Sequence, residues 1–160
     1  MYKRLELHNH TNESDAVFTC KELTDFMVAD QVDAFALTDH NTISGHCKIK
    51  NYLKEHPQPI DFIPGMEYTT YYGHILCLNL TEYVPWENIN RHKPELLFRA
   101  ARKKGALVGV AHPYSFGWPF AQGCRFEMTI TDYSCCDFIE IFNNPEPVSY
   151  THLRAHETCA

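Results

Sequence analysis

The chain has 160 residues, of which 44% are hydrophobic and 13% aromatic, a composition that suits one folded domain rather than a disordered segment. Its net charge of −6 argues against a nucleic-acid partner, which would need clustered basic residues. No stretch approaches the roughly 18 apolar residues of a membrane helix, and the N-terminus lacks the apolar region of a secretory signal. Seven cysteines without a C-x-x-C pair predict reduced thiols, and we therefore expect a cytoplasmic protein.

Strand and helix patterns alternate along the chain. Residues 3–10 predict a strand, and the capping-box pair Thr19 and Glu22 predicts an amphipathic helix that ends near residue 30. Repeated βα units of this kind predict an α/β fold with a parallel sheet, either open or closed into a barrel. The remaining elements are expected as strand 32–38, helix 42–56, strand 60–63, a turn at 64–65, extended runs 67–70 and 74–80 around Gly73, helix 94–104 ended by Gly105, and strands 107–111 and 137–142.

The first motif with chemical meaning is His8-Asn9-His10, followed by Asp15. Histidines two residues apart on a strand point to the same face, so one cation can bind both imidazoles. Asp15, in the loop that follows, can add an oxygen ligand. A lone H-x-H is more often part of a surface or a core, but the added carboxylate at a strand end favours a metal site.

A second motif, Thr38-Asp39-His40-Asn41, ends an apolar strand with polar residues that packing alone does not require. We expect His40 to be a metal ligand and Asp39 to orient a ligand or take part in catalysis. The alternative is that Asp39 or Asn41 only caps the helix that follows.

Other candidates stand beside apolar strands further along the chain. Glu67 follows Pro-Gly and is placed to bridge two cations, whereas His74 and His112 would, taken singly, be ordinary core or loop histidines. The strand pattern that contains Glu140 and ends near Asn143 puts both near the site, in contact with a ligand or with substrate.

Taken in order, these motifs resemble the PHP (polymerase and histidinol phosphatase) superfamily over residues 3–147. Residues 68–74 and 123–127 further resemble its CehA/McbA-like branch. The resemblance implies an incomplete, distorted (β/α)7 TIM-like barrel with two or three divalent ions, Zn, Mn or Fe, at the C-terminal ends of the strands. It also implies a set of seven metal ligands, with Glu67 as the bridge between ions: His8, His10, Asp15, His40, Glu67, His74 and His112.

The chain departs from that family pattern near its end. The family's D-x-H motif has no counterpart after residue 112, so we expect two of the family's ligands and the last βα units of the barrel to be missing, which leaves open whether this chain is active. Residues 148–158 match translated sequencing-adapter sequence, which predicts a metallohydrolase domain over 1–147 and a non-native tail over 148–160. The alternative for the tail is a genuine C-terminal helix. An incomplete barrel would expose a sheet edge, which favours association, although the oligomeric state stays open.

The favoured function is metal-dependent hydrolysis of a small, anionic phosphate ester. Closely spaced cations lower the pKa of bound water and neutralise charge on the phosphoryl oxygens. Glu67 and Asp39 are the catalytic candidates together with Arg125, whose planar fork matches phosphate, although a surface salt bridge with Glu127 would equally explain that arginine.

Two further functions keep the metal site. One is hydrolysis of a carboxylic or carbamic ester or an amide, which the aromatic residues around Tyr68, Tyr71 and Tyr72 would suit. The other is a non-catalytic, metal-binding accessory domain. A serine or cysteine nucleophile is disfavoured because the chain lacks a G-x-S-x-G elbow.

Overall fold

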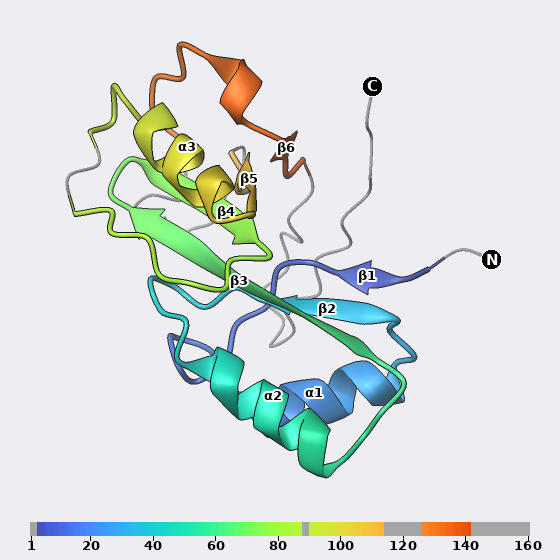
Figure 1. Cartoon of the computed structure of the whole chain (residues 1–160). Coiled ribbons are helices and arrows are strands. Elements are labelled where there is room, and N and C mark those ends of the chain that lie inside the picture. Colours follow the sequence, from blue (N-terminus) through green and yellow to red (C-terminus); the bar gives the residue numbers. More distant parts are fainter. Residues whose placement is uncertain (1–2, 88–89, 114–125, 142–160) are drawn as a thin grey trace.

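The computed structural model of the protein describes residues 3–87, 90–113 and 126–141, and these contain three α-helices and six β-strands (Figure 1). The predicted tail over 148–160 lies outside the described residues, as do the candidate site residues Arg125 and Asn143.

The first half of the fold consists of two parallel crossovers. Strands β1 (Leu5–Glu6), β2 (Ala34–Leu37) and β3 (Asp61–Thr70) pair in parallel. Helices α1 (Cys20–Ala29) and α2 (Gly45–Glu55) connect them and pack side by side. Helix α1 begins at the predicted capping box, with reciprocal bonds between Thr19 and Glu22. The core beneath this half is formed by residues of both helices and β2, among them Leu23, Met27, Phe35, Leu37 and Ile49.

The second half contains one strand, β4, that runs in the opposite direction to the others. Strand β4 (Gly73–Leu78) pairs antiparallel with both β3 and β5 (Leu107–Val110), and β5 pairs in parallel with β6 (Phe138–Ile139). Helix α3 (Glu95–Lys103) precedes β5, packs against it and is followed by Gly105 at φ +84°, the left-handed position predicted for its end. A short 3-10 helix (Tyr133–Cys135) precedes β6. A second core lies here, including Tyr68, Ile75, Leu97, Phe98 and Val108.

Two predictions about the sheet are wrong. The sheet is mixed rather than parallel, because β4 runs against its neighbours. No turn occurs at 64–65: β3 continues through both residues. Pro64 is the last residue of β3 that pairs with β2 and Gly65 is the first that pairs with β4, so the proline lies where the ladder changes partners. A Cβ on Gly65 would lie 2.7 Å from the Cys77 carbonyl oxygen, so only glycine allows this close approach.

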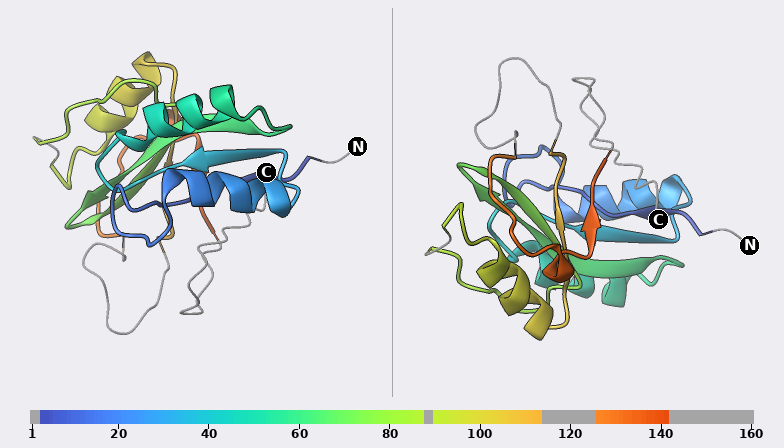
Figure 2. Two further views of the ribbon diagram at one scale, coloured as in Figure 1. Left: turned by 90° about the horizontal axis from the view of Figure 1, so that it is seen from below. Right: turned by 90° about the horizontal axis from the view of Figure 1, so that it is seen from above.

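The six strands follow one another in sequence order, and the sheet curls into a half-barrel with the helices around its periphery (Figure 2). The curl brings the residues that follow the first and last strands close together. The side chain of Glu140, just after β6, lies 3.2 Å from that of His8, just after β1. Since β4 runs in the opposite direction, His74 near its start lies at the same end of the sheet as the residues that follow the other strands. Side chains from six segments therefore converge at one end of the half-barrel.

Candidate metal centre

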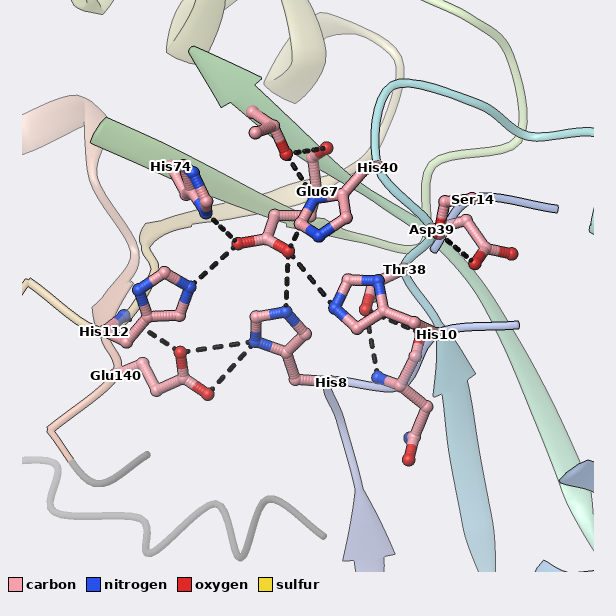
Figure 3. A network of polar contacts seen from close by, with 12 residues as sticks. His8, His10, Ser14, Thr38, Asp39, His40, Glu67, His74, His112 and Glu140 are labelled. Atoms are coloured by element: carbon pink, nitrogen blue, oxygen red, sulfur yellow. Dashed lines mark hydrogen bonds and ion pairs between the residues drawn. The ribbon is translucent and has the colours of Figure 1, made fainter. Parts of the chain in front are cut away.

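Glu67, on β3, is fully buried and lies at the centre of five histidines, a group we call the Glu67 cluster (Figure 3). Each carboxylate oxygen has its own set of ring nitrogens. The Oε2 contacts are His8 Nε2 at 2.9 Å, His10 Nε2 at 3.2 Å and His40 Nδ1 at 3.2 Å, and the Oε1 contacts are His74 Nδ1 at 2.7 Å and His112 Nε2 at 2.9 Å.

His8 and His10 of the first motif lie beyond the short strand β1, which covers two residues and not the predicted 3–10. Hydrogen bonds of Asn9, the residue between them, hold them in place. The Asn9 N–H donates to Thr38 Oγ1 at 3.0 Å, and the Thr38 hydroxyl donates to the Asn9 carbonyl at 3.1 Å. The Asn9 amide also donates to the carbonyls of Glu6 and Ala36, both at 3.1 Å. This locking of Asn9 directs the flanking His8 and His10 toward Glu67.

Asn41 fixes His40 against β3. Its amide oxygen accepts the Thr69 N–H at 2.9 Å and its amide nitrogen donates to the Thr69 carbonyl at 3.1 Å, as a neighbouring strand would. The residue has φ +54°, a conformation that asparagine tolerates better than most residues. The His40 ring also contacts the Thr69 hydroxyl. Asn41 thus extends the pairing of β2 with β3, and within the described part of the chain the N-cap residue of α2, Ser44, makes no side-chain capping hydrogen bond.

Asp39 is buried and directed toward the loop of residues 11–15, away from the histidine rings. It accepts hydrogen bonds from the Thr11 N–H at 2.6 Å, the Thr11 hydroxyl at 2.7 Å and the Ser14 hydroxyl at 2.7 Å. That loop carries Asp15, whose Oδ2 lies 3.5 Å from His40 Nε2. Asp39 therefore holds the loop that carries Asp15, a predicted ligand, and does not orient the side chain of a ligand directly.

Glu140 and His112 meet on the other side of the cluster. The Glu140 carboxylate accepts the His112 backbone N–H at 2.9 Å and lies 3.2 Å from His8 Nδ1. His112 has φ +26°, outside the regions that L-residues favour. Strained backbone of this kind is often found at functional sites.

Burial and charge oppose each other within the cluster. Burial lowers the pKa of His8, but Glu67 and Glu140 raise it more strongly, to about 10. Burial likewise raises the pKa of Glu67, yet the surrounding histidines, led by His8, hold it well below its usual value. For His40, burial lowers the pKa and outweighs the opposite effect of Glu67. The Glu67 carboxylate is thus ionised although it is buried, and the histidine rings around it take the place of water as its hydrogen-bond partners.

The donor set fits divalent cations. An ionised carboxylate offers about four lone-pair positions, so it cannot accept a separate hydrogen bond from each of five ring nitrogens. Among the residues that the structure describes, three further ring nitrogens, His10 Nδ1, His74 Nε2 and His112 Nδ1, are buried without a hydrogen-bond partner. In three groups of residues the ligand atoms lie within 4.8 Å of one another: His8–His10–Glu67, His10–Asp15–His40 and His40–Glu67–His74. Imidazole and carboxylate together are ligands that zinc, manganese and iron accept.

The seven residues predicted as ligands lie in or beside this cluster, and Glu140 touches it. Tyr68, in contrast, is buried in the core with its hydroxyl donating to the Val84 carbonyl at 3.0 Å, so it does not line the site. Sequence reasoning missed Thr69 and the bonding roles of Asn9 and Asn41. Thr69 could have been found from its position, because on a strand it shares a face with Glu67 two residues before it.

The sequence profile of the PHP domain matches residues 6–112, a range that holds Glu67 and the five histidines. The chain belongs to the PHP family. Together with the histidine and carboxylate groups, this places it among metal-dependent hydrolases. No described helix of this PHP chain is both long enough and apolar enough to cross a membrane.

Several proteins are similar to this PHP chain over part or most of its length. An uncharacterized protein of Methanocaldococcus jannaschii is 28% identical over 151 residues, which cover 88% of this chain and 81% of that protein. The 5'-3' exoribonuclease Rnm of Escherichia coli is 30% identical over 116 residues, which cover 66% of this chain and 40% of the enzyme. The chain thus spans less than half of the length of that exoribonuclease.

Solved structures share the fold. A two-domain protein of Bacteroides vulgatus that contains a predicted PHP-like metal-dependent phosphoesterase superposes with a TM-score of 0.66 at 22% identity, over 87% of this chain and 44% of that one. A proposed metal-dependent phosphoesterase of Bifidobacterium adolescentis gives 0.52 at 14% identity, over 72% and 70% of the two chains. At these identities the likeness concerns the fold alone.

Proposed function

We propose that this chain is a metal-dependent phosphoesterase that acts on small, anionic phosphate esters. The observation that carries the proposal is the Glu67 carboxylate shared among five histidine nitrogens from four other segments of the half-barrel. A buried carboxylate in this position bridges cations more readily than it accepts five hydrogen bonds. The relative whose name includes exoribonuclease supports hydrolysis of a phosphate ester.

In this proposal, the three ligand groups hold two or three ions of zinc, manganese or iron. Glu67 belongs to two of the groups, His10 and His40 each belong to two, and Asp15 contributes the outermost carboxylate. Such ions activate water and neutralise charge on a phosphoryl group when they are bound. His112 extends the ligand set on the Oε1 side of Glu67.

The protein itself controls access to this site. The rings of His8, His74 and His112 are buried and exclude water from the inner side of Glu67. His40 is partly exposed and Asp15 is exposed, so substrate approaches from the side of these two residues. Arg125 remains our candidate for binding the anionic group of the substrate.

The direct test is hydrolysis of an aryl phosphate monoester and an aryl phosphate diester by the metal-stripped chain, before and after addition of Mn²⁺ or Zn²⁺. We expect activity only with metal and expect His74→Gln to lower it strongly. His56→Gln is the matched control, because His56 is an exposed histidine that contacts Tyr52 and not the cluster. Loss of activity in both variants would contradict a role for the cluster.

Matched substrates separate the alternatives. Faster metal-dependent cleavage of an aryl carboxylic or carbamic ester would replace the phosphoesterase proposal with carbonyl chemistry. Stoichiometric metal binding without hydrolysis of any ester would favour a non-catalytic accessory domain. A short oligoribonucleotide belongs in the same assay, because its degradation would overturn our expectation, based on the net charge of −6, that nucleic acid is not a partner.

A further inference from the structure

Glu140 joins the two ends of the curled sheet at the Glu67 cluster. We propose that Glu140 is a positioning residue that sets the ring of His8 and the backbone of His112 for metal binding. The inference rests on the proposed metal-dependent function. It assigns a task to a carboxylate that lies beside the ligand groups and belongs to none of them.

The first observation is the contact with the ring of His8. Both Glu140 oxygens face His8 Nδ1, at 3.2 and 3.3 Å, while the opposite nitrogen, Nε2, faces Glu67 at 2.9 Å (Figure 3). A ring that donates its Nδ1–H to a carboxylate keeps the Nε2 lone pair free for a cation. Glu140 thereby selects the tautomer of His8 that the proposed site requires and fixes the orientation of the ring.

The second observation is the contact with the backbone of His112. Glu140 Oε2 accepts the His112 N–H at 2.9 Å, and His112 has φ +26°. A residue with a side chain adopts such a conformation only where its surroundings hold it there. By accepting this N–H, the Glu140 carboxylate favours the backbone conformation that presents His112 Nε2 to Glu67.

The third observation is the topology. The strand order runs from β1 to β6, and His8 and Glu140, which follow these end strands, are 132 residues apart in sequence. The Glu140 backbone is anchored on its own side, since its N–H donates to the Val110 carbonyl at 2.9 Å. A single side chain therefore connects ligands that follow β1 and β5, where no described strand pairing joins these strands directly.

Asp137 provides a matched comparison. It lies just before β6, and its carboxylate also accepts a backbone N–H of the neighbouring strand, that of Val108 at 2.9 Å. Its second contact is with Arg102, at 3.4 Å, and not with a histidine of the cluster. Substitutions of Asp137 therefore report the general cost of removing a carboxylate that joins β5 to β6.

The experiment compares Zn²⁺ affinity, by competition with a chromophoric chelator, in the wild-type chain and in E140A, E140Q, D137A and D137N. We expect E140A to weaken Zn²⁺ binding by about 10–100-fold, the range typical of lost partners of ligating histidines. E140Q should lose less, because its amide oxygen can still accept one N–H. The two Asp137 variants should bind Zn²⁺ as tightly as wild type, because no ligating histidine loses its partner in them.

A spectroscopic measurement separates positioning from general stability. In zinc-loaded wild-type protein, ¹⁵N spectra of the imidazoles should show His8 protonated at Nδ1 and bound through Nε2. This signature should persist in D137A and weaken or disappear in E140A. Unchanged affinity and tautomer in E140A would overturn the inference, and so would equal losses in E140A and D137A. A wild-type chain that binds no Zn²⁺ would overturn the proposed function itself, a result distinct from both.

Discussion

The two sides of the Glu67 cluster differ in their access to solvent. On the inner side, the side chains of Glu67, His74 and His112 are 1%, 5% and 7% exposed. On the outer side, His40 is 24% exposed and Asp15 is 67% exposed. The inner side is thus a fixed, desolvated set of groups held by strand pairing, whereas the outer side depends on a loop. We infer that the inner side retains metal and the outer side admits substrate.

The largest effect should come from Glu67→Gln, which keeps the buried volume and removes the charge shared by both sides. An amide oxygen cannot replace a bridging carboxylate, so we expect loss of metal from both sides. We expect kcat/KM for an aryl phosphate to fall about a thousandfold or more, since each decade corresponds to about 1.4 kcal/mol of barrier. Metal content and steady-state rates test this. Retention of both in a folded variant would contradict the central role of Glu67.

A comparison of one ligand from each side should separate their roles. We expect His74→Gln to weaken metal binding by about 100-fold, roughly 2.7 kcal/mol, because a buried ring has no substitute there. Asp15→Asn should weaken it by only about tenfold, since water can take the place of an exposed carboxylate. Calorimetric titration with Mn²⁺ measures both. Equal losses would remove the distinction between the inner and outer sides.

Metal binding should strengthen as pH rises. Against the effect of burial, Glu67 and Glu140 raise the pKa of His8 to about 10, so the metal-free cluster carries a proton on His8 at neutral pH. Since a ligating histidine must be neutral, binding releases that proton, and affinity should rise about tenfold per pH unit below pH 10. Titrations at pH 6, 7 and 8 in buffers of different ionisation enthalpy test the proton release. An affinity that does not vary with pH would exclude His8 as a protonated ligand in the free state.

The smallest effect on the ligands themselves should come from Asp39→Asn, which weakens the attachment of the loop that carries Asp15. Asp39 accepts three hydrogen bonds from Thr11 and Ser14, and losing its charge should lower the free energy of unfolding by about 1.5–3 kcal/mol. Urea denaturation gives this value. Zinc binding by the inner side should change little, and a collapse of all metal binding would show that the loop supports both sides.

The elements that local chemistry specifies were predictable. The capping box at Thr19 and the glycine after α3 each have a mechanism that acts within a few residues, and both predictions were confirmed. The Pro64-Gly65 pair was misjudged because its role depends on distant strands: the ladder changes partners there, and the Cys77 carbonyl approaches closely. The prediction of a parallel sheet, which β4 contradicts, failed for the same reason.

In the candidate site, too, the features that depend on nearby residues could be predicted and those that depend on distant segments could not. Residue type and position after a strand were enough to nominate Glu67 and the histidines around it. The sharing of one carboxylate among them could not be derived, because the rings arrive from separate segments whose meeting depends on the curl of the sheet. The role of Asp39 was also hidden, since its partners Thr11 and Ser14 lie 25 or more residues away in sequence.

The most direct test is an anomalous-scattering crystal structure of the wild-type chain soaked with Mn²⁺ or Zn²⁺. We expect ion peaks beside Glu67, about 2.0–2.2 Å from its oxygens and from the histidine nitrogens that now face it. We further expect Glu67 to contact more than one ion. A structure at saturating metal in which Glu67 is still hydrogen-bonded directly to the histidines, with ions elsewhere or absent, would contradict the metal-binding role of the cluster.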